Sequence, residues 1–145
     1  MKRLLVIMGI LVLLLLGRIS VAGEGDAILG QWLTAEGRSV IEIYKCGDGY
    51  CGKIVWLKEP LDKDGKEKRD IHNPDQSLRS RKLIGLQILE GLKYQRKNEY
   101  KGGRIYDPNK GKTYKCKAHL EKDKLNLRGY IGFSLIGRTS TWTRK

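Results

Sequence analysis

Residues 113–121 read TYKCKAHLE, and this segment decides the fold class because its side chains alternate in character. The small and apolar side chains share one face and the polar ones share the other: Tyr114, Cys116, Ala118 and Leu120 against Lys115, Lys117, His119 and Glu121. A period of two is typical of a β-strand with one buried face. The pattern returns in residues 125–131 after a turn at 122–124, which predicts an antiparallel pair of strands.

Short strands are predicted along the whole chain beyond Gly23. Turn signals recur roughly every 8 to 12 residues, and no long segment has helical periodicity. The predicted strands are 28–34, 39–46, 52–57, 86–94, 99–106, 113–120, 125–131 and 137–144. Eight strands are enough for a sheet to close around an interior that side chains fill or that holds one small ligand. We therefore predict an all-β fold, an eight-stranded antiparallel up-and-down β-barrel, with a two-sheet sandwich as the alternative.

The first 22 residues have the pattern of a bacterial secretory signal peptide. The basic pair KR at 2–3 precedes an uncharged apolar run at 4–16, and SVA at 20–22 provides small residues for signal peptidase. Arg18 ends the run before it reaches the ~20 residues that a membrane-spanning helix needs. We expect cleavage after residue 22, a periplasmic or secreted location and no transmembrane segment in the cleaved protein. An uncleaved anchor is the alternative.

The chain is strongly basic, with 29 Lys+Arg against 16 Asp+Glu and a formal net charge of +13. Loss of residues 1–22 removes three basic residues and no acid, which leaves 26 against 16, or +10, on a single domain at 23–145. The charges form no block of five, so no nucleic-acid partner is expected. In an exported protein the charge favours an anionic envelope surface as a partner; a merely solvated basic surface is equally compatible.

The three cysteines, Cys46, Cys51 and Cys116, would all enter an oxidising compartment, where thiols tend to pair. The segment CGDGYC has the Asp-Gly chemistry of a tight turn, and a loop of that length brings two Cβ atoms within disulfide range. We therefore predict a Cys46–Cys51 disulfide. Cys116 is then left over, either as a small buried hydrophobe or as a reactive or intermolecular thiol.

A long polar connection is predicted at residues 58–82. Its DKDG segment at 62–65 lacks the further ligands of a calcium loop, so a charged surface loop is the better interpretation. The sequence NPD at 73–75 is followed by Arg79 and Arg81. Either the NPD residues cap a turn while the arginines form ion pairs with the barrel wall, or the segment covers a cavity and an arginine binds an anionic headgroup.

Side chains suited to catalysis or metal binding are few. His72 and His119 have no third ligand at a fitting spacing, so no metal site is predicted. Ser134 does not lie in a Gly-x-Ser-x-Gly turn. Glu99 and Asp107 could meet across a hairpin, but acid–base catalysis would need an enclosed cleft to shift their pKa values. We predict no catalytic residue, no cofactor and no enzymatic activity; an enzyme that uses unidentified loop residues is a minor alternative.

Two short motifs resemble the closing pair of lipocalins. GQW at 30–32 and WTR at 142–144 are similar to a pairing in which a Gly-x-Trp tryptophan lies under a basic side chain of the last strand. The resemblance implies that Trp32 and Arg144 close the barrel, since the first and last strands of a barrel are neighbours. A cation–π contact of this kind contributes about 0.5–2 kcal/mol.

A longer ordered set of motifs resembles an exported bacterial family known as domain of unknown function 2147. The set covers nearly the whole domain: GQW at 30–32, CGDGYCGKIV at 46–55, NPD at 73–75, GLQIL at 85–89, GRIYDP at 103–108, GKTY at 111–114, LRG at 127–129 and GRTSTW at 137–142. The resemblance implies a lipocalin-like β-barrel in a periplasmic or secreted protein and assigns no activity.

The predicted function is that of a small-molecule carrier whose barrel takes up an apolar or amphipathic ligand such as a lipid. Candidate ligand-binding residues are aromatic and aliphatic side chains of the strands and two arginines of the long connection: Tyr44, Trp56, Leu86, Ile88, Tyr114, Leu125, Leu127, Arg79 and Arg81. A slip of one residue in strand register would turn half of the strand residues outward.

The alternative is a solid barrel that binds an anionic envelope surface or a protein partner through its basic exterior. The interior distinguishes the two hypotheses. Small inward residues such as Gly129, Ala118 and Cys116 would leave a cavity. Four large side chains would fill it if all pointed inward, namely Trp32, Trp142, Tyr106 and Tyr114.

Overall fold

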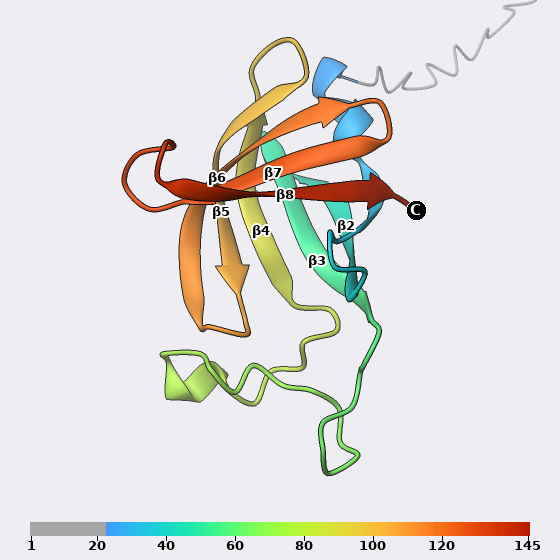
Figure 1. The fold of residues 1–145 in the computed structure, drawn as a ribbon, viewed down its shortest axis with the longest axis vertical. Helices are drawn as coiled ribbons and strands as arrows, with labels where there is room; N and C mark the ends of the chain where they lie inside the picture. Colours follow the sequence, from blue (N-terminus) through green and yellow to red (C-terminus); the bar gives the residue numbers. More distant parts are fainter. Residues whose placement is uncertain (1–22) are drawn as a thin grey trace, which may run out of the picture.

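Eight antiparallel strands close into a barrel in the computed structural model, which describes residues 23–145 (Figure 1). The strands are β1 Gly30–Leu33, β2 Ser39–Cys46, β3 Gly49–Leu57, β4 Gln87–Tyr94, β5 Glu99–Asp107, β6 Lys112–Glu121, β7 Lys124–Tyr130 and β8 Gly137–Arg144. They pair in chain order, and β8 pairs with β1. The predicted up-and-down barrel is confirmed, and the sandwich is wrong because the sheet has no open edges. The predicted signal peptide lies outside the described residues.

The alternation that predicted β6 is present as one buried and one exposed face. Cys116, Ala118 and Leu120 are buried, and they lie opposite Gly129, Leu127 and Leu125 of β7. The two strands therefore present a continuous row of small and aliphatic residues to the interior, as the period of two requires.

A short 3-10 helix, η1 at Glu24–Ile28, covers one end of the barrel. The predicted first strand began at residue 28, but the strand begins at Gly30 because residues 24–28 form this helix instead. Ile28 is fully buried there, and the Tyr100 hydroxyl donates a 2.7 Å hydrogen bond to the Gly25 carbonyl. We call the end of the barrel that η1 covers the closed end. The loops at 34–38, 58–86, 108–111 and 131–136 connect strands at the opposite, open end.

The seam between the first and last strands is made by Trp32 and Arg144, which are register partners. The Arg144 guanidinium carbon lies 4.2 Å from the centre of the Trp32 ring, and the guanidinium donates hydrogen bonds to the carbonyls of Leu29 and Ala27 at 2.9 and 2.7 Å. Gly30 has φ +119°, and a Cβ there would lie 3.1 Å from the arginine. A glycine therefore lets the guanidinium approach the backbone.

The β2–β3 turn carries the predicted disulfide. Cys46 and Cys51 are bonded, with their Cα atoms 5.8 Å apart, which confirms the prediction. Cys116 is free and fully buried in the interior, and burial raises the pKa of its thiol to about 12. The thiol is therefore placed as a small buried hydrophobe rather than as an accessible nucleophile.

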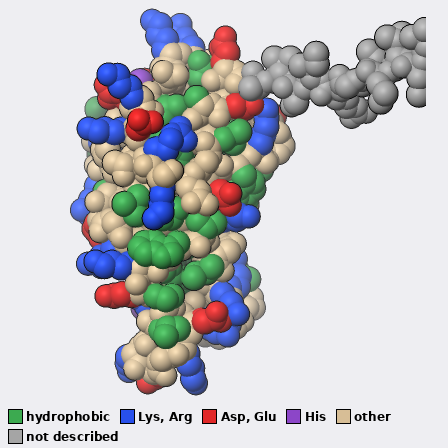
Figure 2. All heavy atoms as spheres, turned by 90° about the vertical axis from the view of Figure 1, so that its right-hand side faces the viewer, with side chains coloured by type: hydrophobic (Ala, Val, Ile, Leu, Met, Phe, Trp, Pro, Cys, Tyr) green, Lys and Arg blue, Asp and Glu red, His purple; other side chains and the backbone are tan. Residues whose placement is uncertain are grey.

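The connection between β3 and β4 spans residues 58–86 and extends beyond the barrel at the bottom of Figure 1. It contains a 3-10 turn, η2 at Gln76–Leu78, and two isolated β-bridges. On the outer surface, Lys and Arg side chains are dispersed among acidic ones, as Figure 2 shows for one face. Within residues 23–145, no helix is long and apolar enough to cross a membrane.

Candidate functional site

A cavity of about 760 Å³ occupies the open half of the barrel. Its wall is formed by inward-facing aliphatic and aromatic side chains from six strands: Ile54, Leu57, Ile88, Ile105, Tyr114, Leu127 and Trp142. Residues 34–36, 38–39, 58–59 and 107–109 lie at the mouth. The arrangement is a hollow half-barrel that is accessible from one end.

One inward position beside the cavity, Gly129, has no side chain. A Cβ there would be in ordinary van der Waals contact, 3.7 Å from Tyr114 and 3.8 Å from Ile105, so it would fit without displacing a neighbour. Gly103, by contrast, is packed tightly, because a Cβ there would lie 2.7 Å from Leu92. Of these two glycines, only Gly129 leaves room for a side chain.

The floor of the cavity is solid. Trp32, Tyr100, Leu92 and Leu125 are fully buried beneath it, together with Ile28 of η1. Tyr100 contacts the rings of Tyr50 and Tyr94 edge-on, with ring centres 5.8 and 5.4 Å apart. A ligand can therefore enter and leave only through the mouth of the open half.

The rim of the mouth carries more cationic than anionic side chains. Among the lining residues, Arg38, Lys58, Lys68 and Arg138 are basic, and Glu36, Glu59 and Asp107 are acidic. Arg38 pairs with Glu36 at 3.4 Å, and Lys68 pairs with Glu59 at 3.8 Å. Lys58 and Arg138 have no acidic partner within 4.0 Å in the described part of the chain. Two cationic groups at the mouth therefore remain available to an anion.

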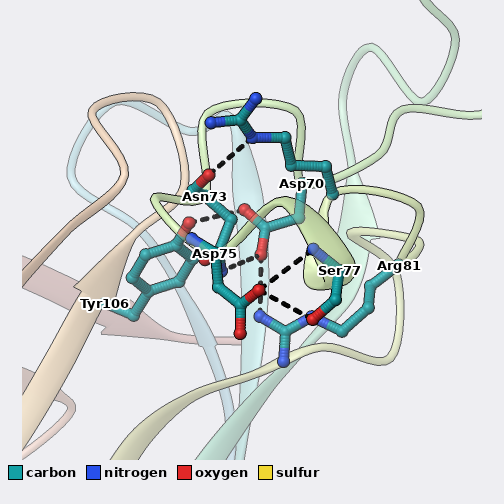
Figure 3. Close-up of polar contacts among 7 residues, drawn as sticks. Asp70, Asn73, Asp75, Ser77, Arg81 and Tyr106 are labelled. Atoms are coloured by element: carbon teal, nitrogen blue, oxygen red, sulfur yellow. Dashed lines mark hydrogen bonds and ion pairs between the residues drawn. The ribbon is translucent and has the colours of Figure 1, made fainter.

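A buried carboxylate organises the long connection beside the mouth (Figure 3). Asp70 is fully buried and accepts hydrogen bonds from the Tyr106 hydroxyl at 2.6 Å, the Arg81 guanidinium at 2.7 Å and the Asn73 amide at 2.8 Å. Burial alone would raise the pKa of Asp70, but these three donors together lower it below its ordinary value. Burial and the Asp70 hydrogen bond raise the pKa of Tyr106 to about 12.

The NPD segment packs against the β5–β6 hairpin through this cluster. The Asn73 side chain accepts from the Asp75 backbone at 2.9 Å, and Asp75 caps η2 by accepting from Ser77 at 3.0 Å (Figure 3). Gly111 has φ +63°, and a Cβ there would overlap the His72 carbonyl oxygen. The glycine therefore permits the close approach of connection and hairpin.

Of the predicted ligand-binding residues, Ile88, Tyr114 and Leu127 line the cavity. Two others, Tyr44 and Trp56, lie on the exterior and do not line the cavity. The Tyr44 hydroxyl donates to Gln87 on the exterior, and Trp56 is 42% exposed with the Lys145 ammonium over its ring. A bulge next to Ile54 shifts the register of β2 and β3, so alternation counted from residue 54 assigns the wrong face to Trp56.

Leu86, Leu125, Arg79 and Arg81 also lie outside the cavity. Leu125 is fully buried at the closed end, and Leu86 is buried in the turn before β4. Arg79 donates to the Asn73 carbonyl at 2.7 Å and Arg81 binds Asp70. The arginines therefore hold the connection together. Among the described residues, neither arginine forms an ion pair with a strand residue, and neither lines the cavity.

Residues 105, 138 and 142 line the cavity but were not predicted. Ile105 was missed because β5 contains a register shift between Tyr100 and Gly103, where Gly102 has φ +74°. The Gly-Gly pair at 102–103 is the sequence signal that could have revealed it. Of the four large candidates, Trp32 lies at the closed end, whereas Trp142, Tyr114 and Tyr106 line the cavity. The Tyr106 hydroxyl also donates to Asp70.

The closed eight-stranded barrel with a Trp–Arg seam and a one-ended cavity defines a lipocalin-like protein. The structure is similar to one described as "Protein HP1028 from the human pathogen Helicobacter pylori belongs to the lipocalin family", with a TM-score of 0.69 and 27% identity over 81% of this chain and 82% of that one. Residues 30–144 match the family described as "Uncharacterized protein conserved in bacteria (DUF2147)", and the chain belongs to that family. A search of the curated proteins found no match.

Proposed function

We propose that the protein is an exported carrier that takes one apolar or amphipathic small molecule into the open half of its barrel. The observation that carries this proposal is the cavity of about 760 Å³. Small-molecule sites occupy about 300–1,000 Å³ and are lined mostly by apolar side chains with a few polar groups. The solid floor and single mouth favour uptake of one ligand rather than passage through the barrel.

The distribution of charge supports an amphipathic ligand with an anionic head. The wall deep in the cavity is aliphatic and aromatic, whereas Lys58 and Arg138 lie at the mouth without acidic partners among the described residues. If the hydrocarbon part of a ligand packed among Ile54, Ile88 and Leu127, its polar end would lie near these cations. A carboxylate or phosphate would gain charge-assisted hydrogen bonds there.

Export is supported by two independent features. The first 22 residues have the charge and hydropathy pattern of a signal peptide. The Cys46–Cys51 disulfide is the kind of bond that forms in an oxidising compartment. The family match to bacterial proteins agrees with a periplasmic or secreted location.

Native mass spectrometry of the protein purified from its own host, followed by organic extraction, tests the proposal. We expect a stoichiometric adduct that extracts as a lipid or another apolar molecule. A bare polypeptide mass, under conditions that preserve a weak complex added as a standard, would refute the carrier and favour a barrel that acts through its basic exterior.

A cavity-filling variant gives a second test. Gly129→Leu adds a side chain at a position that lines the cavity and has room for a Cβ, and we expect it to abolish the adduct while leaving the fold intact. The matched control is Thr143→Leu, which adds a similar side chain at an exposed position of β8. Binding that survives in Gly129→Leu would place the ligand elsewhere.

The anionic head is tested separately with Arg138→Gln. We expect the variant to bind a fatty acid several-fold more weakly and the matching fatty alcohol as well as the unaltered protein does. Equal loss for both probes would mean that Arg138 shapes the mouth without recognising charge.

A further inference from the structure

The β7–β8 loop, residues 131–136, presents four apolar side chains to solvent at the open end of the barrel. Ile131 is 67% exposed, Phe133 77%, Leu135 90% and Ile136 70%. The loop contains no charged residue in a chain of which 31% is charged. A cluster of large apolar side chains held in water is unfavourable unless it has a partner.

Hydrogen bonds hold the loop in a defined shape. The Arg128 guanidinium donates to the carbonyls of Ser134 and Leu135 at 2.5 and 3.2 Å and to the Thr139 hydroxyl at 2.9 Å. The Ile136 amide donates to the Phe133 carbonyl at 3.0 Å. The backbone carbonyls of Phe133, Ser134 and Leu135 and the Ile136 amide are therefore hydrogen-bonded, which lowers the cost of moving these groups into an apolar environment.

Basic side chains lie on the strands next to this loop. Lys115 and Lys117 of β6 lie opposite Tyr130 and Arg128, and Arg138 is the second residue of β8. None of these lysines and arginines has an acidic partner within 4.0 Å in the part of the chain that the structure describes. An apolar tip next to strands that carry unpaired cations is complementary to an anionic bilayer, because the tip can enter the acyl region while the cations meet the headgroups.

We propose that the β7–β8 loop docks the protein on an anionic phospholipid membrane. The loop joins the two strand ends at the mouth, and the residues that follow it, Arg138 and Thr139, line the cavity. In Figure 1 it projects on the side of the barrel away from the C-terminus. Docking would bring the mouth to the membrane surface, and the use of this geometry for ligand exchange rests on the proposed carrier function.

Vesicle sedimentation tests the docking surface. Residues 23–145 are used, because they contain every element of the closed barrel. We expect the protein to bind vesicles of phosphatidylglycerol mixed with phosphatidylcholine, and to bind pure phosphatidylcholine vesicles at least about tenfold more weakly. Phe133→Ser combined with Leu135→Ser is expected to lower binding to the anionic vesicles by about tenfold or more. Both side chains are exposed, so the variant should fold.

The control is Leu61→Ser combined with Ile84→Ser, which removes two exposed apolar side chains from the long connection. This variant should bind vesicles as the unaltered protein does. Three results would each overturn the proposal: no binding to anionic vesicles, unchanged binding by the loop variant, or equal loss in the control. The second result would indicate adsorption through surface charge alone.

Ligand binding in solution separates this inference from the carrier proposal. The loop variant should take up a fatty acid probe with unchanged affinity, because none of its altered side chains lines the cavity. If the protein binds vesicles through the loop but takes up no ligand, the docking proposal stands and the carrier proposal is wrong. If it takes up ligand but does not bind vesicles, the carrier proposal stands and the docking proposal is wrong.

Discussion

The closed and open halves of this barrel are built from the same strands, yet only the closed half is packed solid. At the closed end Trp32, Tyr100 and Leu125 are fully buried under η1. At the open end the same strands surround a cavity of about 760 Å³, with Gly129 as an inward residue. One barrel can thus divide its length into a half that provides stability and a half that provides volume.

The open half has no packed core and is instead stabilised by contacts with the long connection outside the barrel. The long connection reaches the barrel through Asp70, whose bond to Tyr106 joins it to the end of β5. A buried polar cluster fixes geometry without occupying the interior, because its hydrogen bonds are directional. The comparison indicates that the hollow end replaces part of its missing core with this external clamp.

The largest expected effect is from a change that breaks the solid half. Trp32→Ala removes a fully buried indole and the surface on which Arg144 stacks, so we expect a loss of about 3–5 kcal/mol in the free energy of unfolding. Urea denaturation measures it. Trp56→Ala, on the outer wall, serves as the control and should cost about 1 kcal/mol or less. If Trp32→Ala and Trp56→Ala lowered the free energy of unfolding equally, the closed half would not dominate the stability of the barrel.

Two leucines of β7 sharpen the comparison, because one belongs to each half. Leu125→Ala leaves a void in a solid region and should lie near the upper end of about 2–5 kcal/mol. Leu127→Ala enlarges a cavity that already exists and should lie near the lower end. Ligand affinity should change only for Leu127→Ala. If Leu127→Ala lowered the free energy of unfolding more than Leu125→Ala under the same conditions, Leu125 would not belong to the solid half and Leu127 to the hollow one.

Asp70→Asn tests the external clamp and gives it a pH dependence. We expect a loss of about 2–3 kcal/mol at neutral pH, since the buried charge-assisted bonds from Arg81 and Tyr106 weaken. The folded pKa of Asp70 lies below its ordinary value of 3.8, so its contribution is complete above that pH and is lost as pH falls through the folded pKa.

The difference in stability between the unaltered protein and Asp70→Asn should therefore persist from neutral pH down to about pH 4 and shrink below it. Denaturation at a series of pH values checks this. Tyr106→Phe keeps the carboxylate and removes one donor, and it should show a smaller loss. A gap between the unaltered protein and Asp70→Asn that widens in acid would contradict the lowered pKa.

The smallest expected effect belongs to the disulfide at the closed end. Cys46 and Cys51 are separated by only 5 positions. Closing so short a loop lowers the conformational entropy of the unfolded chain, which stabilises the folded state by about 2 kcal/mol. We expect Cys46→Ser with Cys51→Ser to lower the unfolding free energy by that amount at most and to leave ligand uptake unchanged. A loss of uptake would show that the closed half also shapes the cavity.

Most of the fold could be predicted from local pattern, because most strands are amphipathic and all connections but the one at 58–86 are short. The alternation in residues 113–121 predicts the face that β6 buries, and the Asp-Gly turn predicts the disulfide. The β1–β8 seam was predicted from a resemblance, since no local pattern joins Trp32 to Arg144.

The cavity was harder to predict because bulges interrupt the period of two. Register shifts in β3 and β5 exchange inward and outward faces, which misplaced Trp56 and hid Ile105. The roles of Arg79 and Arg81 depended on Asp70, a carboxylate in a charged segment that nothing in the sequence distinguishes from its exposed neighbours. Burial of a single acid is a tertiary property that composition does not encode.

The seam also determines when the molecule can finish folding. Arg144 lies in β8, which pairs with β1, so the barrel cannot close until all eight strands are available. Contacts this distant in sequence form slowly, because a long loop must first be ordered. For a protein that crosses a membrane as an extended chain, this late closure would be an advantage. In such a protein the incomplete chain would stay unfolded behind the membrane, and the barrel would form only after its last strand had arrived.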